Sequence, residues 1–176
     1  GLGAAGARAL PAELVLRSQP PIEHAMAEVG GAFGQVDILV NNGAVPMRKA
    51  ALDVTPAEWE TVVDTDLTGT FFMSQQMGRH LVKSGRPGAI ISISSTHGLI
   101  GFDGRALYGI AKAGVMHMTR MLAIEWAGHG IRVNAVAPGR VDTPSRAPTL
   151  SEPGYKEKAL GRIPLKRFGS VEDVSG

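Results

Sequence analysis

The 176-residue sequence contains no cysteine, few aromatic residues and no long hydrophobic run. The absence of cysteine excludes disulfides and thiolate metal ligands, and it suits a reducing compartment such as the cytoplasm, where we expect the protein. No apolar run approaches the roughly 20 residues that a membrane span needs, so we expect no membrane association. The first residues also lack the basic and apolar stretches of a signal peptide.

The charges are nearly balanced, with 18 Lys and Arg against 16 Asp and Glu. The basic residues form no block, and only two Trp, two Tyr and five Phe are available to stack on bases. We therefore expect no nucleic-acid partner. The five histidines show no ligand spacing, so we predict no metal site.

Short apolar runs alternate with longer helical patterns along the chain. The runs at residues 36–40, 89–93 and 131–136 are typical of buried parallel strands. Helical spacing of apolar residues marks residues 22–33, about 56–83 and about 106–127. The alternation predicts one domain over residues 1–176, with a doubly wound parallel sheet in a Rossmann-like, three-layer α/β/α arrangement. Such sheets bind ligands at the carboxyl ends of their strands.

Both ends of this pattern look incomplete. Gly1-Leu2-Gly3 and the Ala-rich sequence after it resemble the second half of a glycine-rich phosphate loop. Residues 14–16 are a candidate for the next strand, but too few residues separate them from the helix at Ile22 for another helix and strand. At the other end, the sequence stops after a predicted helix start at Val171.

The strongest candidate constellation combines a serine, a tyrosine and a lysine. Tyr108 and Lys112 are four residues apart, which places them on one helical face, one turn from each other. A nearby ammonium favours the phenolate and lowers a tyrosine pKa, and Ser95, at the end of the preceding strand, can hold a substrate oxygen against the tyrosine. This arrangement suits proton transfer coupled to hydride transfer. The alternative is an exposed lysine beside a surface tyrosine, because Tyr-x-x-x-Lys is common by chance.

Three further motifs accompany this constellation, and each lies at the carboxyl end of a predicted strand. With them the chain resembles the short-chain dehydrogenase/reductase family over residues 22–174. The spacing to Tyr108 selects Ser95 over Ser94 as the family's serine. The family's Asn-Asn-Ala-Gly, Ser-x-x-Gly, Tyr-x-x-x-Lys and Ile-Arg-Val-Asn-x-Val-x-Pro-Gly segments are matched by residues 41–44, 95–98, 108–112 and 131–139.

The resemblance implies roles for the matched residues. Tyr108 would be the general acid/base, Ser95 would polarise the substrate oxygen, and Lys112 would lower the tyrosine pKa and bind the nicotinamide ribose. His97 is interpreted as a loop residue near the mouth of the pocket, so the substrate-binding residues would be Ser95, His97 and Tyr108. The implied cofactor is NAD or NADP, and its contacts would come from Tyr108, Lys112, Gly1, Leu2, Gly3, Asn41, Gly43, Pro138, Gly139, Val141 and Thr143.

The sequence departs from the family pattern in three places. The small pair of Asn-Asn-Ala-Gly is swapped to Gly43-Ala44, and an alanine adopts φ > 0 less readily than glycine. Asp66 occupies the place of the family's catalytic-site asparagine, where it would keep the backbone role and add a charge. The stretch that distinguishes NAD from NADP is largely missing, and Arg17 leans weakly toward NADP.

The sequence therefore predicts an NAD(P)-dependent oxidoreductase acting on a small-molecule alcohol or ketone. One alternative is a catalytically weak relative that binds nucleotide as a regulatory or scaffold protein, suggested by Asp66 and the incomplete glycine-rich loop. Another keeps the fold and the Tyr–Lys pair for epimerase or lyase chemistry, but the compact motif spacing argues against it. Residues 143–168 resemble the family's variable substrate-binding loop, whose sequence would set the substrate.

The helix predicted at about residues 106–127 is apolar on more than one face, which predicts cover on two sides. The sheet would cover one side and a second subunit the other, giving a homodimer or homotetramer built on this helix and the one at about residues 56–83. Charged substitutions at Met118 or Leu122 are expected to split the assembly or unfold it, depending on the face. The methionines of these helices are interpreted as core or interface packing: Met73, Met77, Met116, Met118 and Met121.

Overall fold

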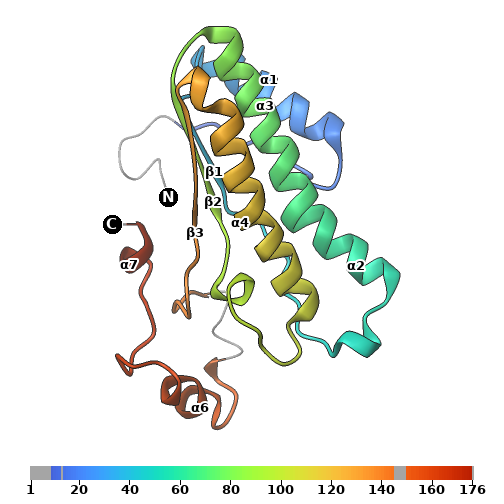
Figure 1. Ribbon diagram of the computed structural model, residues 1–176, viewed down its shortest axis with the longest axis vertical. Coiled ribbons are helices and arrows are strands. Elements are labelled where there is room, and N and C mark those ends of the chain that lie inside the picture. Colours follow the sequence, from blue (N-terminus) through green and yellow to red (C-terminus); the bar gives the residue numbers. More distant parts are fainter. Residues whose placement is uncertain (1–8, 13, 145–149, 176) are drawn as a thin grey trace. The chain divides into compact units, whose positions relative to one another are not determined.

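The computed structural model describes residues 9–12, 14–144 and 150–175. The chain forms two compact units, Gly1–Ala137 and Pro138–Gly176. The first unit holds the sheet and the long helices, and the described part of the second holds the short helices α6 and α7 (Figure 1). None of the helices in the described ranges is long and apolar enough to cross a membrane.

The sheet of the first unit has three parallel strands, in the order β1 (Ile38–Asn41), β2 (Gly88–Ile93) and β3 (Ile131–Val136). The register places Leu39 opposite Ile90, and Ile90 opposite Val133. All three predicted strands are confirmed, with small shifts at the ends of β1 and β2. Because the strands follow one another in chain order, right-handed crossovers bring the connecting helices to one face of the sheet, as Figure 1 shows.

Three long helices form this layer. Helix α1 (Gln19–Phe33) ends at Gly34, which has φ 74°. It packs against α3 (Gly69–Ser84), while α4 (Ala106–Trp126) packs against β3. The core between helices and sheet is buried and apolar, and consists of Met77, Leu81, Ile90, Leu122, Ile131 and Val133. On the opposite face of β1, Ile38 and Val40 are 61% and 55% exposed, so the helices of the described residues cover one face of the sheet.

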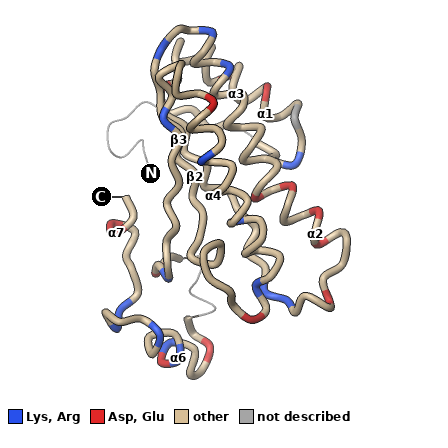
Figure 2. The backbone as a smooth tube through the Cα atoms, in the orientation of Figure 1, with Lys and Arg blue, Asp and Glu red and all other residues tan. Residues whose placement is uncertain are grey.

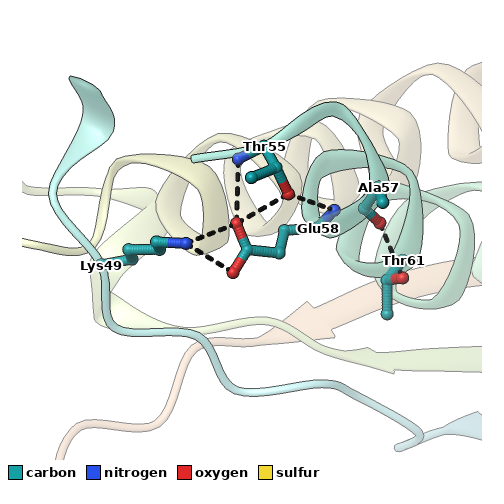
Figure 3. A network of polar contacts seen from close by, with 5 residues as sticks. All are labelled: Lys49, Thr55, Ala57, Glu58 and Thr61. Carbon is teal, nitrogen blue, oxygen red and sulfur yellow. Dashed lines mark hydrogen bonds and ion pairs between the residues drawn. The ribbon is translucent and has the colours of Figure 1, made fainter. Parts of the chain in front are cut away.

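Helix α2 (Pro56–Val63) begins with a proline and a complete capping box. The Thr55 side chain accepts the Glu58 N–H, and the Glu58 carboxylate accepts the Thr55 N–H. Lys49 donates to both carboxylate oxygens of Glu58, at 2.7 and 2.8 Å, so the loop before α2 is tied to its first turn (Figure 3). Figure 2 shows acidic positions in red along this helix.

The sequence pattern predicted one helix over residues 56–83, and the structure shows that it contains a change of geometry. A π-helical segment, η3 (Asp64–Thr68), separates α2 from α3. Single π-helical turns inside α-helices are frequent at functional sites. The segment turns Asp66 into the interior of the unit, where it is fully buried.

The prediction of a strand at residues 14–16 is wrong. Leu14 and Val15 have no regular structure, and Leu16 begins a turn. Leu16 instead packs on glycines: a Cβ added at Gly43 would come within 2.6 Å of Leu16 Cδ1, and one at Gly69 within 2.5 Å of the Leu16 carbonyl oxygen. Tertiary packing, rather than sheet pairing, therefore accounts for Leu16, whereas Leu14 and Val15 are exposed.

The second unit contains α6 (Tyr155–Gly161) and α7 (Glu172–Ser175). Val141 forms a parallel bridge with Gly169, and Gly169 donates its N–H to the Arg140 carbonyl at 2.8 Å. Arg140 also donates to the Tyr155 hydroxyl and lies over the Tyr155 ring, 5.3 Å from its centroid. These contacts connect the start of the unit to both α6 and the residues before α7.

Candidate active site

The candidate site is built where β2 ends and α4 begins. The Ser94 N–H donates to the Val136 carbonyl at 2.7 Å, which extends the β2–β3 pairing by one residue. The chain then turns into η4 (Thr96–Gly98), with the Ser95 side chain accepting the His97 N–H. The Ser94 hydroxyl points instead to the Lys112 carbonyl, at 2.8 Å. Ser94 thus anchors α4, and Ser95 is the N-cap residue of η4.

Two glycines allow η4 to lie directly on the backbone of α4. A Cβ on Gly98 would come within 2.8 Å of the Ala113 nitrogen and of the Lys112 carbonyl carbon. A Cβ on Gly109 would come within 2.8 Å of the His97 carbonyl oxygen. Carbon atoms at such distances clash, so any other residue at either position would separate the two elements. The glycines therefore fix the distance between the serine loop and the tyrosine helix.

Ser95, His97 and Tyr108 form a contact cluster in this close packing. Ser95 Oγ accepts the His97 N–H at 3.2 Å and lies 3.1 Å from His97 Nδ1. The His97 ring is edge-on to Tyr108, with 5.9 Å between centroids, and it also packs on Phe102 at 4.3 Å. The prediction placed His97 near the mouth of the pocket, and the structure places it in contact with both motif residues.

Lys112 is buried, with 3% of its surface exposed. Its ammonium donates to the Ile93 carbonyl at 3.0 Å and lies 5.7 Å from the centroid of the Tyr108 ring. The alternative interpretation, an exposed lysine beside a surface tyrosine, is therefore wrong. A buried ammonium that faces a tyrosine is rare outside functional sites, because burying a charge is costly.

Asp66 is the second buried charge, and it meets Lys112. Its carboxylate oxygen Oδ1 accepts the Val45 N–H at 2.7 Å, and Oδ2 lies 3.6 Å from Lys112 Nζ. Burial raises the pKa of Asp66, an effect opposed by the Val45 N–H and then by Lys112. Burial likewise lowers the pKa of Lys112, and Asp66 opposes this effect. The Asp66 carbonyl accepts the Thr70 hydroxyl at 2.8 Å.

Asn41 ends β1 in a structural network. Its side-chain amide donates to the hydroxyls of Ser74 and Ser92, at 3.0 and 3.3 Å, and so joins β1 to α3 and β2. The swapped pair after it needs no special backbone, because Lys166 is the one non-glycine with positive φ in the described chain. Ala44 therefore takes its place without the strain that the swap suggested.

The remaining predicted cofactor residues lie elsewhere or outside the described part of the chain. Gly1, Leu2 and Gly3 lie outside the described residues. Arg17 is exposed. Pro138, Gly139, Val141 and Thr143 belong to the second unit, so their cofactor contacts stay predictions.

The sequence motifs located the serine, tyrosine and lysine, but they missed much of what holds them. The signal for the close contact was present in part, because Gly98 belongs to the Ser-x-x-Gly motif. Nothing in the sequence pattern indicated that the Ile93 carbonyl receives Lys112, or that the Val45 N–H holds Asp66. Both are backbone groups of residues that side-chain patterns do not select.

A groove of the first unit is a separate feature. It has a volume of about 1240 Å³ and runs between α3 and α4. Its lining includes Phe72, Met118, Met121 and Trp126, and none of the predicted site residues. Within the described ranges, no group of three or more His, Asp or Glu is placed to hold a metal ion.

Comparison with known proteins places the chain among dehydrogenases and reductases. A family model described as enoyl-(acyl carrier protein) reductase matches residues 4–176. The 3-oxoacyl-[acyl-carrier-protein] reductase FabG of Aquifex aeolicus is 40% identical over 170 residues, which are 97% of this chain and 67% of that protein. The 2-dehydro-3-deoxy-D-gluconate 5-dehydrogenase of Dickeya dadantii is 38% identical over 155 residues, which are 88% of this chain and 60% of that protein.

A solved structure gives the same result for the fold. The short-chain type dehydrogenase/reductase from Mycobacterium marinum superposes with a TM-score of 0.91 at 32% identity, covering 99% of this chain and 68% of that one. The likeness confirms the Rossmann-like, three-layer α/β/α fold. The chain thus spans about two thirds or less of these relatives.

Proposed function

The chain belongs to the short-chain dehydrogenase/reductase family, and we propose that it carries the catalytic centre of an NAD(P)-dependent oxidoreductase. The observation that carries the proposal is that Ser95, Tyr108 and Lys112 lie together where η4 packs against α4. Backbone contact between η4 and α4 brings the serine to the tyrosine, and Lys112 is buried with its ammonium toward the tyrosine ring. This arrangement suits proton transfer, because a hydroxyl donor and a basic group both lie beside the tyrosine.

Each side chain then has one task. Tyr108 donates its hydroxyl proton to a carbonyl oxygen during reduction and takes it back during oxidation. The Ser95 hydroxyl accepts the His97 N–H and lies 3.1 Å from His97 Nδ1, so its O–H donates to the substrate oxygen when it turns away from that ring nitrogen. The Lys112 ammonium stabilises the phenolate that Tyr108 becomes after it has given up its proton.

The N–H donors of Lys112 fit the ribose of a nicotinamide dinucleotide. An ammonium has three N–H bonds, and the Ile93 carbonyl takes one of those on Lys112, which leaves donors for a ribose hydroxyl. When bound, the nicotinamide gives or accepts the hydride. We leave the choice between NAD and NADP open, because the residue that leaned toward NADP, Arg17, is exposed.

The substrate class we propose is a small-molecule alcohol or ketone. Ser95 and Tyr108 together present two hydroxyl groups, which match one carbonyl or alcohol oxygen. The same relatives that show the family are named as reductases of a 3-oxoacyl group and as a dehydrogenase of a sugar acid. All of these reactions interconvert a ketone and a secondary alcohol, which supports the class without selecting a member.

The test is Tyr108→Phe, measured by the absorbance of reduced nicotinamide against a panel of alcohols and ketones. The substitution removes only the ionisable oxygen, so turnover should fall by about 10²–10⁴-fold, the usual value of acid/base catalysis, with dinucleotide binding nearly intact. Thr61→Val is the control, since it removes an exposed hydroxyl from α2, outside the site. If Tyr108→Phe keeps most of its kcat, Tyr108 is not the acid/base.

The same assay separates the alternatives. A regulatory or scaffold protein would bind dinucleotide without turning over any member of the panel. An epimerase or lyase would convert substrate without net change in reduced nicotinamide.

We also propose that the protein is a homo-oligomer joined through the groove between α3 and α4. The support is the apolar character of this surface: Met121 is 47% exposed, and Phe72 and Trp126 line the same groove. Exposed apolar grooves rimmed by polar residues mark sites of protein–protein contact. A second copy of α3 and α4 would cover it.

A further inference from the structure

Asp66 stands at the junction of three segments of the site. It lies on the π-helical segment η3, its Oδ1 accepts the N–H of Val45 on the loop after β1, and its Oδ2 faces Lys112 on α4 at 3.6 Å. Both ionisable side chains are almost completely buried, at 0% and 4% exposure. Oδ2 has no hydrogen-bond donor among the described residues, so its interaction is with the ammonium alone.

A buried carboxylate beside a buried ammonium changes what the lysine can do. If the proton stays on the lysine, the carboxylate compensates its charge. If the proton moves to the carboxylate, the lysine has no charge. In both arrangements the pair is neutral, so Lys112 presents little uncompensated positive charge to Tyr108, whose ring centroid lies 5.7 Å from Nζ.

We propose that Asp66 is a positioning residue that acts through Lys112, as the buried counter-ion of the lysine. Because Asp66 compensates the lysine's charge, Tyr108 keeps its proton up to a higher pH than it would beside an uncompensated ammonium. The proposal rests on the proposed function, in which Tyr108 is the acid/base. The consequence is that the pH range in which Tyr108 can act as an acid extends to higher pH. The protein stays competent to donate a proton to a carbonyl at more alkaline pH, and it becomes competent to oxidise an alcohol only at correspondingly higher pH.

The other ionisable groups around this pair are few. His97 on η4 packs against the Tyr108 ring, and Arg105, the N-cap residue of α4, donates to the Met47 carbonyl. Neither contacts Asp66, whose pKa is influenced by the Val45 N–H and Lys112. A change made at Asp66 therefore reaches Tyr108 through Lys112, with His97 and Arg105 left as they are.

The test uses the fact that the chain has only two tyrosines. In a Tyr155→Phe background, Tyr108 is the only tyrosine, so the near-ultraviolet tyrosinate absorbance follows its proton directly, with no cofactor or substrate present. Asp66→Asn keeps the shape and an oxygen to accept the Val45 N–H but removes the charge. We expect the midpoint of the tyrosinate titration to fall by about one pH unit, since an ammonium within reach of an acid lowers its pKa by one unit or more.

The matched control is Asp64→Asn, which removes the same charge from the same π-helical segment without touching Lys112. It should leave the midpoint unchanged. If Asp66→Asn fails to fold, Asp66→Ser gives the same readout with a smaller side chain. A midpoint that stays the same in the folded Asp66 variants, or that moves equally in Asp64→Asn, overturns the proposal.

Kinetics then distinguish this proposal from the proposed function. The pH profile of kcat for carbonyl reduction should lose activity at a pH lower by the same amount as the tyrosinate midpoint, with KM little changed. A shifted tyrosinate midpoint in a protein without any turnover would refute the oxidoreductase function and leave the Asp66–Lys112 coupling intact. Turnover in a protein whose tyrosinate midpoint does not shift would support the oxidoreductase function and refute the Asp66–Lys112 coupling.

Discussion

Gly98→Ala should both destabilise the first unit and slow the proposed reaction. The added Cβ would lie 2.8 Å from two backbone atoms of α4, where ordinary contacts begin at 3.4 Å. Neither backbone atom can move without moving the helix, so η4 and α4 must separate by about 0.6 Å. Overpacking of this kind costs about 1–3 kcal/mol. Since a misplacement of about 1 Å can cost about 10²-fold in rate, we expect turnover to fall at least about tenfold.

Two measurements check this prediction. Denaturant unfolding gives the loss of stability, and the reduced-nicotinamide assay gives the loss of kcat. Gly101→Ala is the control, because it lies in the same loop and a Cβ there meets nothing within 4 Å. A Gly98→Ala protein as stable and as active as Gly101→Ala would show that the contact between η4 and α4 does not set the geometry of the site.

Two further predictions concern the capping network and the groove. The pKa of Glu58 is held at about 2, against an ordinary 4.5, first by the hydrogen bond from Lys49 and then by Thr55. The Glu58 carboxylate therefore stabilises the fold above pH 4.5, and this stability is lost as the pH falls toward 2. In Glu58→Gln the unfolding midpoint should fall less steeply over this pH range. An equally steep fall in the variant would contradict the assignment. At the groove, Met121→Asp should give a folded protein that light scattering shows to be a monomer. Leu122→Asp, which places a charge in the buried core, should unfold the protein. A Met121→Asp protein that remains an oligomer would exclude this surface as the interface.

The sequence located the regular elements well because their signals are local. Parallel strands buried between layers need continuous apolar runs, and residues 131–136 form the third strand with the predicted bounds. The capping box of Thr55 and Glu58 is complete within four residues, so it could be predicted without any tertiary information. Tyr108 and Lys112 were placed together for the same reason, since one helical turn relates them.

What the sequence could not supply depends on contacts between distant segments. Residues 14–16 have the composition of a strand, but Leu16 packs on Gly43 and Gly69 instead of pairing in the sheet. The π-helical turn at Asp66 has no composition of its own, and it is this turn that carries the carboxylate into the interior. The faces of Met118 and Leu122 were left open, and packing decides them: Leu122 is a core residue, while Met118 borders both the core and the groove.

Two departures from the family motifs lie in the described residues, at Gly43-Ala44 and at Asp66, and they differ in their effect on the site. At Gly43-Ala44 the swap exchanges one methyl group between neighbours, and neither residue has a positive φ. An alanine restored at position 43 would meet the tip of the Leu16 side chain, which can move at small cost. At Asp66 the departure adds a charge to a buried position 3.6 Å from the lysine of the site, where water cannot screen it. Of these two, only the change at Asp66 alters the electrostatics that Tyr108 experiences, so the working pH of this protein should differ from that of relatives with asparagine there.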